Sequence, residues 1–471
     1  MEETKNTTDP SKIPLKRVLG LPTGILLVAG IMIGSGTFKK IAPMAQSLTS
    51  EPWIIIAWLI AGIITMFGAF TLGGLASLTK ESGGTYEYLR LCFGNFFSFL
   101  FGWSIFMIGG SGSIAALAFV FSQSVSTLFQ LPDPLHAYSS VSIGHFIYPF
   151  ASSGVKIFAV LTICILTWIN YRGVKKGGVL NNVVTAAKIL GITLLIVLGL
   201  FYSSPQTVSH ATATSTAGMG NTALFSGLFA ALLSALWAYD GFANITYVSG
   251  EIKNPQRNVP IAIIAGVGIA TLLYVLLNYA YLHVMPVSQL AIIGENKIAA
   301  AEVAGVLMGN TGAVVIAVLI MICTFGALNA CIIVYPRVYY RMAQEHFFFK
   351  KVANAHPVFR TPYISLIYSM AWSSILVMTG TFDQLTNLVI FSGFIFYGLA
   401  AWGLIKMKRK KVITTKVIGY PVIPVIVVLF SIILVINTVI VQPLQSLLGL
   451  IFVLSGVPLY YFFKTKNANA K

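Results

Sequence analysis

The sequence is poor in charged residues. Only 9% of its 471 residues are Asp, Glu, Lys or Arg, whereas 57% are hydrophobic, and this balance excludes a water-soluble globule with one buried core. It indicates a polytopic membrane protein, because apolar residues in this proportion need lipid around them. Among the charged residues the acidic ones are in the minority, with 13 Asp and Glu against 30 Lys and Arg, so the formal net charge is +17.

Cysteine and histidine are also scarce, and neither type shows metal-ligand spacing. The six histidines fall in loops or near the ends of apolar runs, so we expect no acid/base or metal cluster at membrane depth, no enzymatic activity and no cofactor. The cysteines are expected to be packing residues in or beside apolar segments. They are Cys92, Cys164, Cys323 and Cys331.

Twelve apolar runs are each about long enough to cross a bilayer. The third and the eighth are longer than a bilayer requires and are expected to tilt or to extend beyond it. The runs cover residues 17–42, 52–78, 86–125, 153–170, 179–203, 221–248, 259–284, 302–335, 362–380, 383–406, 419–441 and 445–463.

The cations predict the orientation in the membrane. If the N-terminus is cytoplasmic, 25 of the 30 Lys and Arg residues fall on the cytoplasmic side and Lys188 falls inside a span. Cytoplasmic loops are enriched in positive charge, so both termini are predicted to be cytoplasmic, with the protein in the cell (plasma) membrane. The same distribution explains the net charge without nucleic acid. The cations expected in outer loops are Lys39, Lys40, Lys156 and Lys297.

The first apolar run is interrupted near its middle. Gly34 and Gly36 flank Ser35, and each glycine costs about 1 kcal/mol of helix propensity relative to alanine. A helix that unwinds there presents free carbonyls near Met32 and Ile33, and free amides from Gly36 onward. These ends suit a zwitterion, whose ammonium binds carbonyls and whose carboxylate binds amides. The alternative is a packing motif of small residues that lets helices approach closely.

A second interruption lies in the sixth run, where Asp240, Gly241 and Asn244 fall in the middle of an apolar stretch. Runs one and six each begin a group of five, and they enter the membrane from opposite sides. Two halves with broken first helices have the inverted symmetry of transporters that bind substrate where the breaks meet. The pattern favours a transporter over a channel, which needs a continuous polar lining.

Two charged residues fall clearly inside the predicted spans, Lys188 and Asp240. Burying an unpaired charge costs on the order of 3 kcal/mol, so both are candidate functional residues. The Lys188 ammonium is expected to find acceptors on the unwound backbone around Ile33 and Gly34. Hydroxyl or carbonyl groups of the eighth run near Thr324 are further expected acceptors. Asp240 is expected to act through its backbone carbonyl or, alternatively, through its side chain.

Three aromatic residues near the second break are further candidates. Trp237 and Tyr239 are candidate pocket residues, and Trp237 is expected to close the site from outside. The alternative is simple packing, because 13% of the residues are aromatic. The Tyr274 hydroxyl needs a partner in lipid surroundings, and a site contact and a structural hydrogen bond both satisfy that need.

Seven short motifs run through nearly the whole chain. They lie at residues 33–38, 82–88, 185–188, 238–242, 253–260, 325–329 and 454–458. In these motifs and in their order the sequence resembles the L-type amino acid transporters of the amino acid, polyamine and organocation superfamily. The resemblance implies an all-α fold like that of the leucine transporter, with two inverted five-helix repeats, twelve transmembrane helices and breaks in helices 1 and 6.

The resemblance also implies how substrate is held. Lys188 would occupy the neighbourhood where sodium-coupled relatives hold an ion, which implies transport without sodium. The implied contacts are amides for the substrate carboxylate at Gly34, Ser35 and Gly36, and carbonyls for the amine at Met32 or Ile33, Trp237 and Asp240.

The expected organisation follows the repeats. Residues 286–301 are expected to form a short amphipathic segment that caps an outer vestibule. The expected segments are a cytoplasmic tail (1–16), a first repeat (17–203), an outer connector (204–220), a second repeat (221–406), a basic cytoplasmic loop (407–418), two further spans (419–463) and a cytoplasmic tail (464–471).

We therefore predict a sodium-independent transporter that exchanges L-amino acids with neutral side chains by alternating access. Two alternatives stay open: a proton-coupled symporter, and an amine, polyamine or cationic amino acid carrier, for which only Asp240 supplies an acidic side chain. Residues 126–152 contain no cysteine, whereas partner-dependent members of the resembled branch use one there to link a glycoprotein, so no disulfide-linked partner is expected. Ala243 stands where several relatives carry a polar residue. Homodimerisation is left open.

Overall fold

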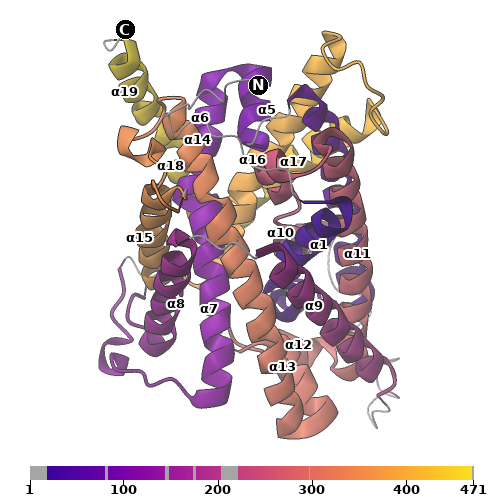
Figure 1. The fold of residues 1–471 in the computed structure, drawn as a ribbon. Helices are drawn as coiled ribbons and strands as arrows, with labels where there is room; N and C mark the ends of the chain where they lie inside the picture. The colour runs from indigo at the N-terminus through magenta and orange to yellow at the C-terminus, as the bar shows by residue number, and fades with distance from the viewer. Residues whose placement is uncertain are drawn as a thin grey trace, which may run out of the picture.

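The computed structural model describes residues 19–79, 83–143, 148–172, 177–202, 221–295, 297–359 and 361–468. These residues form a bundle of helices joined by turns and loops (Figure 1), with no strand among them beyond one isolated backbone bridge. The all-α fold is therefore confirmed. The predicted N-terminal tail, 1–16, and the predicted connector, 204–220, lie outside the described residues.

The membrane spans agree with those predicted. In the described ranges, eleven helical stretches are long and apolar enough to cross a membrane. A twelfth apolar helix, α15 (Tyr363–Thr379), has 17 residues, which is close to the shortest length that spans a bilayer. Together these twelve correspond one to one with the predicted runs, so the chain is a multi-pass membrane protein.

The helices divide into two groups of five spans and a final pair. The first group is α1 (Leu21–Met32) with α2 (Gly36–Lys39), α4 (Glu51–Leu75), α6 (Asn95–Ser104) with α7 (Gly110–Phe129), α8 (Ser153–Tyr171) and α9 (Gly177–Leu200). The second group is α10 (Asn221–Tyr239), α11 (Pro255–Val284), α13 (Ala299–Val334) with α14 (Pro336–Gln344), α15, and α16 (Phe382–Arg409). The final pair is α17 (Val422–Val441), and α18 (Pro443–Leu454) with α19 (Gly456–Ala468). The short helices between spans include α3 (Ile41–Ser47), α5 (Thr85–Phe93) and α12 (Val287–Ala291).

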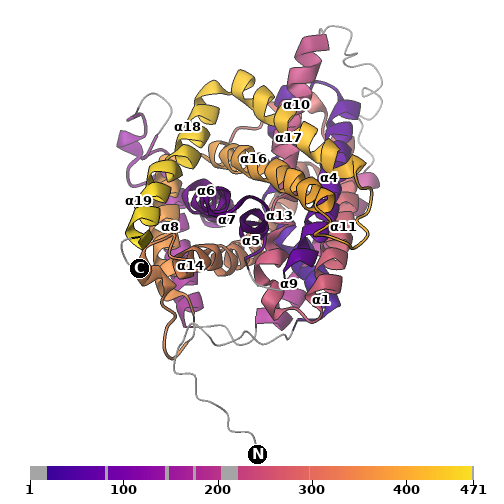
Figure 2. The ribbon, with the colours of Figure 1, turned by 90° about the horizontal axis from the view of Figure 1, so that it is seen from above.

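The breaks of the two interrupted helices lie inside the bundle, and α18 and α19 lie on its edge. α1 packs against α9, α11 and α13, whereas α10 packs against α4, α16 and α17. Seen from above, α18 and α19 run along the rim beside α6 and α16, away from α1 and α9 (Figure 2). The unwound residues 33–35 and 241–243 are buried, which allows their unpaired backbone groups to exist at membrane depth.

Two ends of the bundle matter for the site. α19 lies at one end and α12 at the other (Figure 1), and we call these ends the α19 face and the α12 face. α3 packs against α12, so the second half of the first span points to the α12 face. The first half starts at the opposite end, where the Lys253 amide donates to the Leu19 carbonyl at 2.9 Å. This bond ties the start of span one to the end of span six.

Candidate substrate site

The first predicted break is present. α1 ends at Met32, α2 begins at Gly36, and the three residues between them are not helical. Helical backbone continues through Lys40 into α3, so the second half of this span reaches Ser47. The carbonyls that end the first half and the amides that begin the second half therefore meet at mid-depth.

The second predicted break is also present. α10 ends at Tyr239, the chain turns through residues 240–243, and a short 3-10 segment follows over Asn244–Glu251. Gly241 has φ of 92°, in the left-handed region that favours glycine. A residue with a side chain would be strained there, so glycine allows the turn that ends α10.

Tyr239 and Tyr274 support this second break. The Tyr274 hydroxyl donates to the Ala238 carbonyl at 2.9 Å, and the Tyr239 hydroxyl donates to the Trp58 carbonyl on α4 at 3.1 Å. The rings of Trp58, Tyr239 and Tyr274 pack on one another, with centroids 5.1 to 6.1 Å apart. In this structure Tyr274 therefore makes the structural hydrogen bond, and its contact with substrate stays a prediction.

The two breaks touch each other. A Cβ atom added to Gly36 would stand 2.5 Å from the Cα atom of Ala238, and one added to Gly241 would stand 2.5 Å from a methyl carbon of Ile31. Both separations are shorter than real Cβ contacts, so glycine at these positions is what lets the broken helices meet. The two interpretations of the glycines, an unwound site and a close-packing motif, thus hold together.

A small cavity of about 20 Å³ lies between the two breaks. A space of this size holds about one water molecule, so the predicted substrate, an amino acid, does not fit into the cavity in this closed form. The predicted residues Ile33, Tyr239 and Tyr274 are not in its lining. The predicted residues that line it are Met32, Gly34, Ser35, Gly36, Trp237 and Asp240.

Several residues that line the cavity were not predicted as site residues from the sequence. Ser113 and Leu117 come from α7, whereas Tyr335 follows directly after α13 and its hydroxyl accepts a hydrogen bond from the Asn244 side chain at 3.4 Å. A run of glycine and serine at residues 109–113 was the available signal in α7, because such a run leaves space inside an apolar span. The residues not predicted to be near the site are Ile31, Ser113, Leu117, Cys331 and Tyr335, whereas Gly241 and Asn244 were predicted as part of the second break.

Trp237 connects the cavity to the start of α16. Its indole Nε1 donates to the Ser35 hydroxyl at 3.2 Å. The indole ring also meets the Phe382 ring edge-on, with centroids 6.1 Å apart. The Trp237 side chain therefore joins the first break, the second break and α16.

Lys188 reaches the first break from α9. Its Nζ donates to the carbonyls of Gly30 and Ile33 at 2.9 and 3.1 Å, and the residue is 1% exposed. Ile33 is a predicted acceptor, whereas Gly30 takes the place expected for Gly34. The Thr324 hydroxyl donates instead to carbonyls of its own helix, α13. The buried ammonium is thus held by carbonyls that unwinding sets free.

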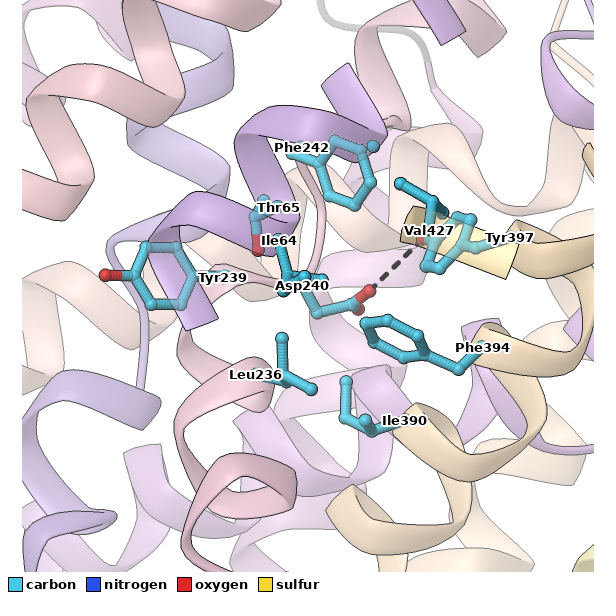
Figure 3. A pocket seen from close by; sticks show the side chains of 11 residues that line it. Ile64, Thr65, Leu236, Tyr239, Asp240, Phe242, Ile390, Phe394, Tyr397 and Val427 are labelled. Atoms are coloured by element: carbon cyan, nitrogen blue, oxygen red, sulfur yellow. Dashed lines mark hydrogen bonds between the residues drawn. The ribbon is translucent and has the colours of Figure 1, made fainter. Parts of the chain in front are cut away.

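The Asp240 side chain lies against α16. Figure 3 shows it directed toward Tyr397 of α16, whose hydroxyl lies 3.5 Å from a carboxylate oxygen. The two side chains line a second cavity, which Figure 3 shows. It also has a volume of about 20 Å³, and most of its lining is apolar. Asp240 lines both cavities.

Lys39 and Lys40 were predicted to lie in an outer loop, and this prediction is wrong. They are 3% and 0% exposed, and they lie at the end of α2 beneath α16 and the segment before α13. Lys156 is also buried, at 4%, and donates to the Met378 carbonyl at 3.1 Å. Of the four cations expected in outer loops, Lys297 is exposed.

Known proteins resemble this chain over almost its entire length. A sequence profile described as amino acid permease matches residues 19–462. The chain belongs to the amino acid permease family. One relative is the serine/threonine exchanger SteT of Bacillus subtilis (strain 168), which is 30% identical over 460 residues, covering 97% of this permease and 98% of SteT.

Mammalian relatives point the same way. The b(0,+)-type amino acid transporter 1 of Mus musculus is 28% identical over 464 residues, covering 98% of the permease and 91% of the relative. The large neutral amino acids transporter small subunit 2 of the same species is 26% identical over 469 residues, covering 98% of the permease and 83% of the relative. These relatives confirm the predicted L-type amino acid transporter family, and the permease is a transporter rather than an enzyme.

Proposed function

We propose that this permease exchanges L-amino acids with neutral side chains across the plasma membrane, by alternating access and without sodium. The observation that carries the proposal is the pair of touching helix breaks with a small cavity between them. Broken helices of this kind offer carbonyls to an ammonium and amides to a carboxylate at one point. This arrangement recognises the part that all amino acids share.

The backbone is proposed to bind both ends of the substrate. Its carboxylate is assigned to the amides of Gly34, Ser35 and Gly36, which begin the second half of span one. Its amine is assigned to carbonyls of Met32, Trp237 and Asp240. Both carbonyls already accept one hydrogen bond, that of Ile33 from Lys188 and that of Met32 from the Gly34 amide at 2.8 Å, but only Met32 lies in the cavity lining. Met32 is therefore the better placed of the two predicted amine contacts in α1.

Sodium independence is supported by Lys188. Its ammonium donates hydrogen bonds to two carbonyls of the first break. A bound cation would stabilise the carbonyls of an unwound helix in the same way. We propose that this built-in charge braces the carboxylate site in every step of the cycle. The Lys188 ammonium then takes the place that a bound sodium ion would occupy.

Proton-coupled symport is a second candidate function, and one observation favours it. The Asp240 carboxylate lies in a mostly apolar cavity opposite the Tyr397 hydroxyl, where gain and loss of a proton would change its interactions. The same observation argues against an amine, polyamine or cationic amino acid carrier. Such a carrier needs an acidic group aimed at the substrate, whereas this carboxylate is directed toward α16.

We propose that the permease works without a disulfide-linked glycoprotein, because residues 126–152 contain no cysteine. We also propose that its α19 face and both termini are cytoplasmic, as the distribution of Lys and Arg predicts. Transport by the purified chain alone tests the first point, and light scattering of the same sample measures whether it is a dimer. Labelling of cysteines introduced near the C-terminus, from each side of sealed vesicles, tests the second.

Counterflow in proteoliposomes tests the function. Purified permease is reconstituted into vesicles loaded with an unlabelled amino acid, and uptake of a panel of labelled amino acids is measured in sodium and in choline buffers. We expect uptake of amino acids with neutral side chains only when an internal amino acid is present, at equal rates in both buffers. Methyl esters of good substrates should compete poorly, because they have lost the anion that the amides bind.

The same assay distinguishes the alternatives. Uptake into empty vesicles that is driven by a proton gradient would replace exchange with symport. Preference for polyamines or cationic amino acids would overturn the substrate assignment. Strict dependence on sodium would overturn the role of Lys188 as the resident cation.

A further inference from the structure

Two buried lysines at the end of α2 have no role in the function proposed above. Lys39 and Lys40 are 3% and 0% exposed. A buried ammonium is costly unless it is paired and hydrogen-bonded, so each side chain should have specific partners. The partners come from three different elements, and none of these elements is α2 itself.

Lys40 binds the start of α16. Its Nζ lies 2.5 Å from an Asp383 carboxylate oxygen and 2.6 Å from the Thr386 hydroxyl. Asp383 is in the first turn of α16, where the helix dipole stabilises a carboxylate. A capping box between Thr381 and Gln384 secures this turn. The ion pair is therefore anchored on a rigid helix end, with the Asp383 side chain only 18% exposed.

Lys39 binds two other elements through neutral acceptors. Its Nζ donates to the Gln123 side-chain oxygen on α7 at 2.8 Å and to the Glu295 carbonyl, before α13, at 2.5 Å. The Gln123 amide donates to the same Glu295 carbonyl at 3.3 Å. Lys39 thus ties α2 to α7 and to the segment that was expected to cap the outer vestibule.

One aromatic ring links the lysines to the cavity. The Phe382 ring centroid lies 4.7 Å from Lys39 Nζ and 4.8 Å from Lys40 Nζ, within the range of cation–π attraction. The same ring meets Trp237, whose indole donates to the Ser35 hydroxyl. A continuous chain of contacts therefore runs from the first break to the lysine pair.

We propose that Lys39 and Lys40 are positioning residues for transport, which hold the second half of span one closed over the cavity on the α12 face. Lys39 and Lys40 stand where α2 joins α3, so their side chains fasten the middle of this half-span to α16, α7 and the segment before α13. Opening the cavity toward the α12 face separates α2 from α16 and α7. The Lys40–Asp383 pair and the Lys39 hydrogen bonds then break. This proposal rests on the alternating access of the proposed function.

The consequence for the cycle is a bias toward the state closed on this face. Removal of the Asp383 charge leaves the Lys40 ammonium buried without its counter-ion, and that state is strongly disfavoured. Opening hydrates the ammonium and relieves the penalty. A variant without the pair should therefore spend more time open on the α12 face.

Accessibility of Cys331 measures this opening directly. Cys331 lines the cavity and is 4% exposed in the closed structure, so a membrane-impermeant methanethiosulfonate reaches it only when the cavity opens. The reagent is applied to each face of sealed vesicles in turn, and peptide mass spectrometry quantifies modification of this cysteine. Lys297→Cys marks the α12 face, because Lys297 is exposed there. It is also the matched control, because it removes an exposed ion pair with Glu302.

We expect Asp383→Asn to raise the rate of Cys331 modification from the α12 face about tenfold, the effect of a shift of about 1.4 kcal/mol. Lys297→Cys should leave that rate unchanged. The exchange Lys40→Asp with Asp383→Lys should return the rate to within about threefold of the wild type, because it restores opposite charges. Size-exclusion profiles show which variants are folded.

Other results would overturn the proposal. A folded Asp383→Asn variant with the wild-type modification rate would make the pair purely structural. If that variant does not fold, Lys40→Met decides, because it leaves the Asp383 carboxylate without its counter-ion and should also raise the rate. A wild-type rate in Lys40→Met would also refute the proposal. The labelling needs no transported substrate, so it succeeds or fails independently of the counterflow result.

Discussion

Gly36→Ala tests the contact on which the site depends. The added methyl would stand 2.5 Å from the Cα atom of Ala238, whereas carbon atoms in contact lie about 3.5 to 4.0 Å apart. The two broken helices would have to separate by about 1 Å to accept it. The obstacle is backbone and cannot rotate away, so we expect the upper end of the usual overpacking cost, about 3 kcal/mol. That cost would lower the population of the closed state about a hundredfold.

The measurement is the counterflow rate with the best substrate of the panel, together with the size-exclusion profile. Gly268→Ala in α11 is the matched control, because its added methyl would make an ordinary contact at 3.8 Å with Met66. We expect Gly36→Ala to lose nearly all exchange, Gly36→Val to lose it completely, and Gly268→Ala to keep it. Wild-type exchange in Gly36→Ala would show that the two breaks do not approach this closely in the working protein. A valine side chain would fill the proposed carboxylate site, and the contact with Ala238 adds a second reason for the loss.

Three further substitutions test individual side chains. Ser35→Ala removes the acceptor of the Trp237 indole, and a hydrogen bond of this kind contributes about 1 kcal/mol. The apparent substrate affinity should therefore fall about fivefold, and an unchanged affinity would contradict the contact. Trp237→Ala should lower the maximal counterflow rate while preserving the ranking of substrates, because the ring covers the site rather than selecting the side chain; an unchanged rate would return it to simple packing. Lys188→Ala should yield folded protein with little exchange, because two carbonyls of the first break lose their donor, whereas exchange at the wild-type rate in sodium-free buffer would remove Lys188 from the mechanism.

The positions of the helix breaks could be predicted from the sequence. Glycines around Ser35, and a charged residue followed by Gly241, stand in the middle of apolar runs, where they weaken a helix and add nothing to contact with lipid. Lys188 was found by the same reasoning, because a charge deep in a span must have acceptors. The structure supplies such acceptors at the first break, at Gly30 and Ile33.

Lys40 shows where sequence reasoning fails. A lysine at the end of an apolar run looks like the boundary of a span, because free lysines belong in water. Its partner Asp383 lies 343 residues away in the chain, and nothing local announces that the two meet. Lys39 has the same difficulty, since its acceptors are a glutamine side chain of α7 and a backbone carbonyl before α13.

The sequence by itself determined the membrane class, the twelve spans, the place of both breaks and the deep position of Lys188 within a span, because hydropathy and helix propensity are properties of neighbouring residues. Only the tertiary structure decided the size of the cavity, the contribution of Tyr335, the direction of the Asp240 carboxylate and the burial of the lysine pair. These features depend on which distant helices pack together. Packing brings together groups that are hundreds of residues apart, and no local pattern records it.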